Sequence, residues 1–214
     1  MSWRLTAGLI VALCGAVAFA RLLQDPESGV MTWDAARASG FAGYLLLWAS
    51  VMTGMALHLR FRPFGGPLTF PLEGHRIVSA LAFAFTVVHV FALVLDPLVH
   101  FSPVDVLVPY AAGYRPFQVG MGTLAQWLLV VVLATTAMTG PQSISYYAWR
   151  RFHYLSFPAW LLAFLHGVFA GTDASARPAL VIYAGSASLL AGLFVIRLYG
   201  RATATSGERL NPSS

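Results

Sequence analysis

Four histidines form two pairs of nearly equal spacing within the apolar parts of this sequence. His75 and His89 stand 14 residues apart, in a stretch that is apolar or small apart from Arg76. His153 and His166 stand 13 residues apart in a second apolar stretch. Imidazoles in such surroundings bind metal, relay protons or form hydrogen bonds in a packed interior. The predicted structure of the segments that carry the histidines indicates which of these chemistries is favoured.

The composition is that of a membrane protein. Of the 214 residues, 58% are hydrophobic and 10% are charged, against about 25% charged residues in soluble domains, and the mean hydropathy is +0.71. A helix that crosses a bilayer needs roughly 20 mainly apolar residues. Six runs reach or approach this length: about 5–23, 41–59, 75–95, about 120–139, 152–170 and about 179–198. Because the runs are continuous rather than alternating, they predict an all-α, six-helix transmembrane bundle.

The cations predict the orientation of this bundle. The formal charge is +5 and all thirteen cations are arginines, scattered between apolar runs; this distribution argues against a nucleic-acid partner. With the N-terminus inside, nine arginines fall inside and four fall outside, which predicts that both termini are cytoplasmic. The nine are Arg4, Arg60, Arg62, Arg76, Arg150, Arg151, Arg197, Arg201 and Arg209, and the four are Arg21, Arg37, Arg115 and Arg177.

The two ends of the chain differ from its middle. Residues 2–20 have the basic start, apolar centre and A-F-A ending of a secretory signal peptide, whose cleavage would leave five helices with unchanged orientation. We expect the first helix to be retained. The single cysteine, Cys14, excludes an intrachain disulfide and a multi-cysteine metal site. Residues 201–214 are predicted to be a polar C-terminal tail that follows a transmembrane domain of residues 1–200.

The predicted topology places the paired histidines at two depths. Helices 75–95 and 152–170 both run from inside to outside, so His75 and His153 lie near the inner edge and His89 and His166 lie toward the outer side. Thirteen or fourteen residues rise about 20 Å along a helix, within a hydrocarbon core of about 30 Å. Each depth therefore offers one imidazole from each helix, which is the axial ligand set of a six-coordinate haem iron.

The angular fit of the two pairs is uneven. At 3.6 residues per turn, a spacing of 14 returns to within about 40° of the same helix face, whereas a spacing of 13 misses it by about 140°. Pro158 lies inside the second pair and removes a backbone hydrogen bond. We predict that it kinks or re-phases that helix.

Other readings of the histidines remain open at this stage. Because no two histidines are three or four residues apart, a compact zinc site is disfavoured. A proton-coupled transporter would use them as relay groups beside mid-membrane acids, but every acid lies in a loop or near a helix end. A structural subunit would leave them as packing residues. His58 and His100 stand near helix ends and are predicted to be interfacial.

Arginines near the histidines are candidates for holding a porphyrin carboxylate. A guanidinium forms strong charge-assisted hydrogen bonds to a carboxylate. Arg76 and Arg151 stand beside the inner histidines, and Arg115 lies in the outer loop VPYAAGYRPF. We include these three among the candidate cofactor-binding residues, although the positive-inside rule alone also accounts for the inner two.

These features resemble the ferric-reductase-like transmembrane domain family. The resemblance rests on H-x13-H at 75–89, H-x12-H at 153–166, the segment WRRFHYLSFPAWLLAFLHG and the loop VPYAAGYRPF, and it covers about residues 5–200. The family includes ferric reductases, NADPH oxidases and the haem-binding membrane subunit of a periplasmic methionine sulfoxide reductase. The resemblance implies two haem b groups, with axial pairs His75/His153 on the inner haem and His89/His166 on the outer haem.

The function implied by the resemblance is transmembrane electron transfer to an acceptor outside a bacterial inner membrane. No G-x-G-x-x-G follows a predicted strand, and the flavin and nicotinamide domain of the full-length reductases has no counterpart here. We therefore expect a separate donor: a cytoplasmic flavoprotein reductase that carries the flavin, or the quinone pool. The chain would then be an oxidoreductase or a subunit of one. An alternative is the haem-binding subunit that feeds a periplasmic methionine sulfoxide reductase, and in either case the bilayer and a periplasmic acceptor are the expected partners.

Overall fold

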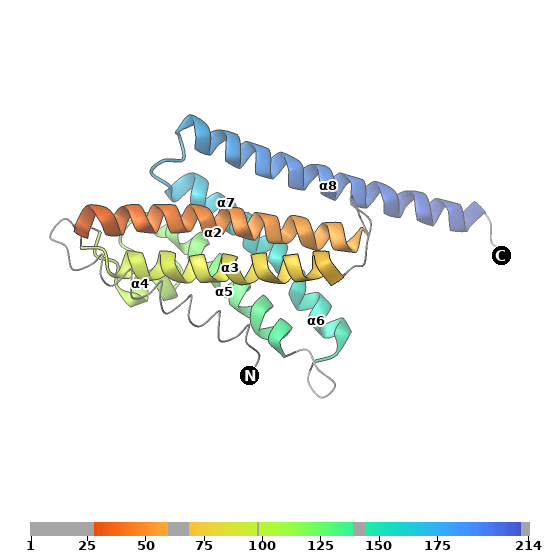
Figure 1. Ribbon diagram of the computed structural model, residues 1–214, viewed down its shortest axis with the longest axis horizontal. Coiled ribbons are helices and arrows are strands. Elements are labelled where there is room, and N and C mark those ends of the chain that lie inside the picture. Colours follow the sequence, from red (N-terminus) through yellow and green to blue (C-terminus); the bar gives the residue numbers. More distant parts are fainter. Residues whose placement is uncertain (1–27, 60–68, 98, 139–143, 211–214) are drawn as a thin grey trace.

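The computed structural model describes residues 28–59, 69–97, 99–138 and 144–210, which fold into helices joined by short turns and loops (Figure 1). The helices within these ranges are α2 (Ser28–His58), α3 (Thr69–Val94), α4 (Pro103–Leu107), α5 (Pro116–Ala137), α6 (Tyr146–His153), α7 (Ser156–Ala170) and α8 (Arg177–Leu210).

The prediction of an all-helical membrane protein is confirmed for this part of the chain. Five segments of the described residues are long and apolar enough to cross a membrane: Thr32–His58, Leu72–Val94, Pro116–Ala137, Tyr146–Ala170 and Arg177–Tyr199. They correspond to the second to sixth predicted spans. The predicted first span, 5–23, and with it the question of a cleaved signal peptide, lies outside the described residues.

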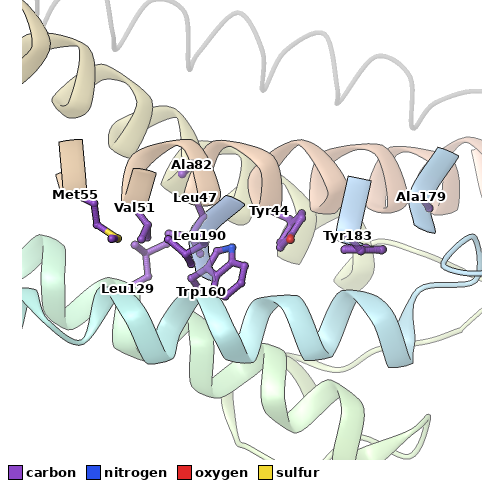
Figure 2. Packing of buried hydrophobic residues seen from close by; sticks show 10 residues of the cluster. All are labelled: Tyr44, Leu47, Val51, Met55, Ala82, Leu129, Trp160, Ala179, Tyr183 and Leu190. Atoms are coloured by element: carbon purple, nitrogen blue, oxygen red, sulfur yellow. The ribbon is translucent and has the colours of Figure 1, made fainter. Parts of the chain in front are cut away.

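Two antiparallel helix pairs make the body of the bundle, α2 with α3 and α5 with α7, and α8 runs along its upper edge (Figure 1). The core lies where α2 faces α5, α7 and α8. Apolar side chains of α2 recur every three or four residues and so form one stripe, which meets Leu129 of α5, Trp160 of α7 and Leu190 of α8 (Figure 2). The stripe consists of Tyr44, Leu47, Val51 and Met55.

One face of α3 is not covered by any of the described residues. Large apolar side chains recur along it at spacings of three or four residues, and each is more than one third exposed among the described residues. A helix face of this kind is suited to contact with lipid, since lipid tails are as apolar as the side chains. It consists of Ile77, Leu81, Phe85, Val88 and Phe91, and Leu95 continues it directly after the helix.

Two helices, α2 and α8, extend furthest beyond their predicted apolar windows. α2 begins at Ser28, thirteen residues before the predicted start at 41. Its first turns remain helical because polar side chains find partners there: Thr32 donates to buried Asp96 at 2.9 Å. α8 continues to Leu210, so the predicted boundary at residue 201 does not mark the end of a helix. Hydropathy locates the apolar window of a helix and not its ends.

The fifth predicted helix, 152–170, is two helices in the structure. α6 ends at His153 and α7 begins at Ser156, with a tight turn between them. Pro158 cannot donate to the carbonyl of Tyr154, the bond that would carry the helix through this point. The Tyr154 carbonyl accepts instead from the N–H of Phe157 at 3.2 Å, in a tighter turn. The helix is therefore interrupted at Tyr154 and Leu155, just before the proline at which a kink or re-phasing was predicted.

Hydropathy does not predict the short helix α4, because its five residues form no long apolar run. Ser102 caps it, with Pro103 in its first turn and Asp105 completing a capping box by accepting from the backbone and hydroxyl of Ser102. These hydrogen bonds lower the pKa of the Asp105 carboxyl from its usual range. The sequence S-P-V-D carries the signature of such a helix start, and it would have been sufficient to predict it.

Candidate functional site

The structure brings the four predicted histidines together in the expected combinations. The ring centroids of His75 and His153 are 6.1 Å apart, with 64° between the ring planes. The centroids of His89 and His166 are 6.2 Å apart, with 74° between the planes. α3 supplies one ring of each pair, and α6 and α7 supply the others. Along α3 the two pairs are separated by about 20 Å.

Three of these imidazoles are held through Nδ1 by a helix carbonyl. His89 Nδ1 lies 2.7 Å from the carbonyl oxygen of Ala36, and His166 Nδ1 lies 2.8 Å from that of Gln118. His75 Nδ1 lies 3.1 Å from the carbonyl oxygen of Ser50. A carbonyl only accepts, so Nδ1 is the protonated nitrogen and Nε2 keeps its lone pair. This is the arrangement in which histidine ligates a metal, because the tether fixes both tautomer and ring orientation.

A glycine stands four residues beyond each of the first two accepting carbonyls. A Cβ added to Gly40 would lie 2.7 Å from Nδ1 of His89, and one added to Gly122 would lie 2.8 Å from Nδ1 of His166. Real Cβ contacts are essentially never that short. The missing side chain lets each imidazole lie against the backbone of the neighbouring helix and reach its carbonyl.

The same arrangement recurs in looser form at His75. Gly54 stands four residues beyond Ser50, and a Cβ there would lie 3.3 Å from Cε1 of His75. Gly40 and Gly54 are 14 residues apart on α2, as are His75 and His89 on the antiparallel helix α3. A glycine of α2 thus lies against a histidine of α3 at two positions, which are about four helical turns apart.

His153 is held differently. Its Nδ1 is buried and has no hydrogen-bond partner among the described residues. Trp149 packs against the ring, with centroids 4.9 Å apart and 33° between the planes, and the indole of Trp149 donates to Thr136 Oγ1 at 3.2 Å. His153 is therefore positioned by ring packing at the end of α6 rather than by a carbonyl tether.

A cavity of about 620 Å³ adjoins the His89–His166 pair. This volume falls within the roughly 300–1,000 Å³ typical of cofactor and ligand sites. Its walls are mostly apolar and include Gly40, Leu47, Leu129 and Ala163. Arg37 and Asp173 also line it.

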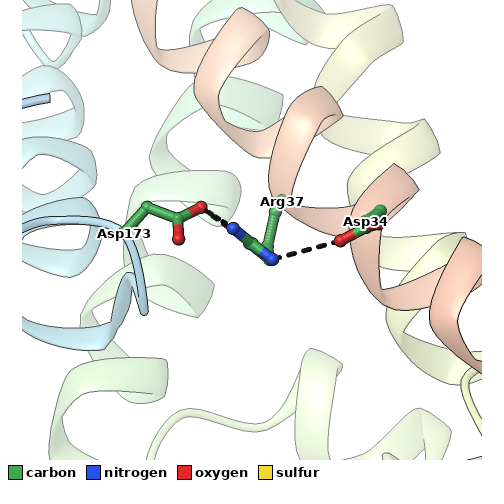
Figure 3. Close-up of polar contacts among 3 residues, drawn as sticks. All are labelled: Asp34, Arg37 and Asp173. Atoms are coloured by element: carbon green, nitrogen blue, oxygen red, sulfur yellow. Dashed lines mark hydrogen bonds and ion pairs between the residues drawn. The ribbon is translucent and has the colours of Figure 1, made fainter. Parts of the chain in front are cut away.

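Arg37 lines the cavity. The sequence alone indicates only that it is one of the arginines expected on the outer side. Its guanidinium pairs with Asp173, beyond the end of α7, and with Asp34 at 3.1 Å on its own helix (Figure 3). The contact joins α2 to the turn between α7 and α8. Only the i, i+3 pair with Asp34 is visible in the sequence; the partner 136 residues away is not.

The three predicted cofactor-binding arginines do not line this cavity. Arg76 is exposed and pairs with Glu73 at 2.9 Å. Arg115 donates to the carbonyls of Phe169 and Ala170 at 3.0 and 3.3 Å, at the C-terminus of α7. Arg151 is exposed on α6. Their role toward a cofactor stays a prediction.

The other two histidines lie apart from these pairs. His58 ends α2 and His100 stands in the turn before α4, and both are exposed. Across residues 28–59, 69–97, 99–138 and 144–210, no group of three or more His, Cys, Asp or Glu side chains is arranged to hold a metal ion. Within the described residues, the histidine rings therefore lie together as two separate pairs, and no larger cluster is formed.

The paired histidines fit a porphyrin iron on the chemistry of their donors. Each pair supplies two imidazoles, three of the four rings present Nε2 in ligating form, and glycines leave room for those rings. Comparisons of the chain with protein-family models, curated proteins and solved structures found no match. The resemblance to the ferric-reductase-like family therefore continues to rest on the sequence pattern.

Proposed function

We propose that this chain is a membrane-embedded electron conduit that holds two haem b groups, one between His75 and His153 and one between His89 and His166. The observation that carries the proposal is the ring separation of 6.1 and 6.2 Å in the two pairs. An ion bound at about 2 Å by a nitrogen from each of two facing imidazoles separates their centroids by roughly 6 Å.

The bound haem would supply reversible one-electron chemistry of its iron. The carbonyls of Ser50, Ala36 and Gln118 hold three of the four imidazoles and set their tautomer. A tethered Nδ1–H makes the imidazole a more basic ligand, so the pair with two short tethers differs electronically from the pair that contains His153. If one imidazole from each helix held the iron, the chain would leave the iron no place for a substrate, and the haem would supply outer-sphere electron transfer.

The proposed direction of transfer follows from the arginine distribution. With both termini cytoplasmic in a bacterial inner membrane, the His75–His153 pair lies on the donor side and the His89–His166 pair lies on the acceptor side. The donor would be a cytoplasmic flavoprotein or a quinol. The acceptor would be ferric iron, oxygen or a periplasmic protein, which includes the methionine sulfoxide reductase alternative.

Haem content tests this proposal directly. The purified wild-type chain should contain two low-spin haem b groups, counted by iron and by reduced-minus-oxidised absorbance. The variant His89→Ala should retain one haem, because the imidazole pair of His75 and His153 is intact about 20 Å away. It should also lose transfer to outer acceptors.

The exposed His100 offers a matched control. His100→Ala should keep both haems and the wild-type spectrum, because His100 belongs to neither pair. A colourless wild-type chain, even after supplementation with haem, would refute the electron-conduit proposal. Two haems retained in His89→Ala would refute the ligand assignment.

A further inference from the structure

Two guanidinium groups converge on one tyrosine at the turn between α6 and α7. Arg150 Nε donates to the Tyr154 hydroxyl oxygen at 3.0 Å, and Arg197 of α8 approaches the same oxygen at 3.5 Å. Each guanidinium carbon also lies 5.7 Å from the centre of the Tyr154 ring. Residues from α6, the turn and α8 thus form one cluster, which we call the Arg–Tyr cluster.

Among the side chains that the structure describes, the Arg–Tyr cluster has two positive charges and no anion. Ion pairs among the described side chains join Arg37 to Asp34 and Asp173, and Arg76 to Glu73; none includes Arg150 or Arg197. Arg197 is only 9% exposed. A cationic residue buried to this degree is costly unless its charge is paired, and a neutral phenol at 3.5 Å is a weak partner.

The surroundings of the cluster are those of a membrane interface. It lies at the end of the bundle that carries His75 and His153, where the arginine excess predicts the cytoplasmic surface. On α6, Tyr146 and Tyr147 are 62% and 78% exposed, as aromatic residues are in the belt at headgroup level. Basic pockets between transmembrane helices on this side of a bilayer are typical sites for acidic lipid headgroups.

We propose that the Arg–Tyr cluster binds an oxyanion, and that the phosphate of an anionic phospholipid supplies it. The planar guanidinium forks of Arg150 and Arg197 match a phosphate in two-pronged geometry, and the Tyr154 hydroxyl adds a donor between them. The site goes beyond the proposed electron transfer and does not depend on it. A carboxylate has the same chemistry, so a haem propionate is the second source that the experiment must separate.

The experiment uses the full chain in detergent with added phosphatidylglycerol or phosphatidylcholine. Phosphatidylglycerol should raise the midpoint of thermal unfolding more than phosphatidylcholine, and native mass spectrometry should detect a retained anionic lipid. Arg150→Gln and Arg197→Gln should each weaken this binding about tenfold, since each removes a charge-assisted bond. Arg150 is partly exposed, so its variant tests the site even if the Arg197 variant folds poorly. Arg177→Gln is the control, because Arg177 is exposed at the opposite end of α8.

Haem loading separates the two sources. If the two variants bind haem about tenfold more weakly than the Arg177→Gln control but respond to lipid as the control does, a haem carboxylate occupies the site. If lipid response and haem loading both equal those of the control, the oxyanion site is refuted. The lipid response should be the same on haem-free protein, so its failure is distinct from failure of the electron-conduit proposal.

Discussion

At the scale of single residues, Gly40 occupies a position that no side chain can share with the imidazole of His89. An added Cβ would lie 2.7 Å from Nδ1 and 2.9 Å from Cε1 of a ring that is itself tied to Ala36. Gly40→Ala should therefore displace the ring and cost about 1–3 kcal/mol of stability, as overpacking does. Haem affinity at this pair should fall by about 10–100-fold, because the tether is lost with the ring position.

Gly192→Ala is the matched control for this prediction. A Cβ at Gly192, on α8, meets nothing within 4 Å, so the change should be neutral or raise stability by up to about 1 kcal/mol through helix propensity. Thermal unfolding and haem titration of both variants provide the comparison. Equal haem affinity in the two variants would show that the glycine is not required for the imidazole to be placed.

At the scale of elements, the interruption between α6 and α7 places His153. A continuous helix would set His153 and His166 about 140° apart around its axis, yet both face partners on α3. Pro158→Ala restores the N–H that can donate to Tyr154 and favours a continuous helix. We expect this variant to lose the haem of the His75–His153 pair and keep the other, as measured by haem count and absorbance.

Pro178, in the first turn of α8, serves as the control for this proline. Proline is well tolerated in a first turn because the N–H that it lacks has no helical partner there. Pro178→Ala should therefore leave both haems in place. Two haems in Pro158→Ala would mean that the turn at Tyr154 and Leu155 forms without the proline.

At the scale of the whole molecule, the proposed orientation gives opposite accessibility to the two ends of the bundle. Gly113 is exposed before α5, and Tyr147 is 78% exposed on α6. In a Cys14→Ala background, Gly113→Cys should react with a membrane-impermeant maleimide on intact cells, and Tyr147→Cys should react only after lysis. The reverse pattern would place the termini outside and invert the proposed direction of electron transfer.

The sequence was sufficient to predict the five spans of the described residues and the pairing of the histidine rings, because both depend on local regularities. The length of an apolar run indicates a membrane helix. Which histidine rings lie together follows from their spacing along each helix and from the position of one proline. The start of α2 could not be read in this way, because Thr32 is accommodated by Asp96, 64 residues away in the sequence.

The surroundings of the histidines were harder to predict for the same reason. Each carbonyl tether joins two helices, as His89 is joined to Ala36 across 53 residues, and so depends on how they pack. The role of Gly40 appears only when the register between α2 and α3 is known. The pairing of Arg37 with Asp173 and the convergence of Arg150 and Arg197 on Tyr154 likewise join segments far apart in the chain.

The matched fourteen-residue spacing on α2 and α3 limits how this protein can change length during evolution. One residue inserted between Gly40 and Gly54 would rotate one glycine by about 100° relative to the other, so a single imidazole would lose its carbonyl and its space. An insertion between His75 and His89 would have the same effect from the other side. We therefore expect substitutions on the exposed apolar side of these segments to be tolerated, and insertions or deletions between the paired positions not to be. We expect related chains to vary in composition here while keeping the number of residues constant.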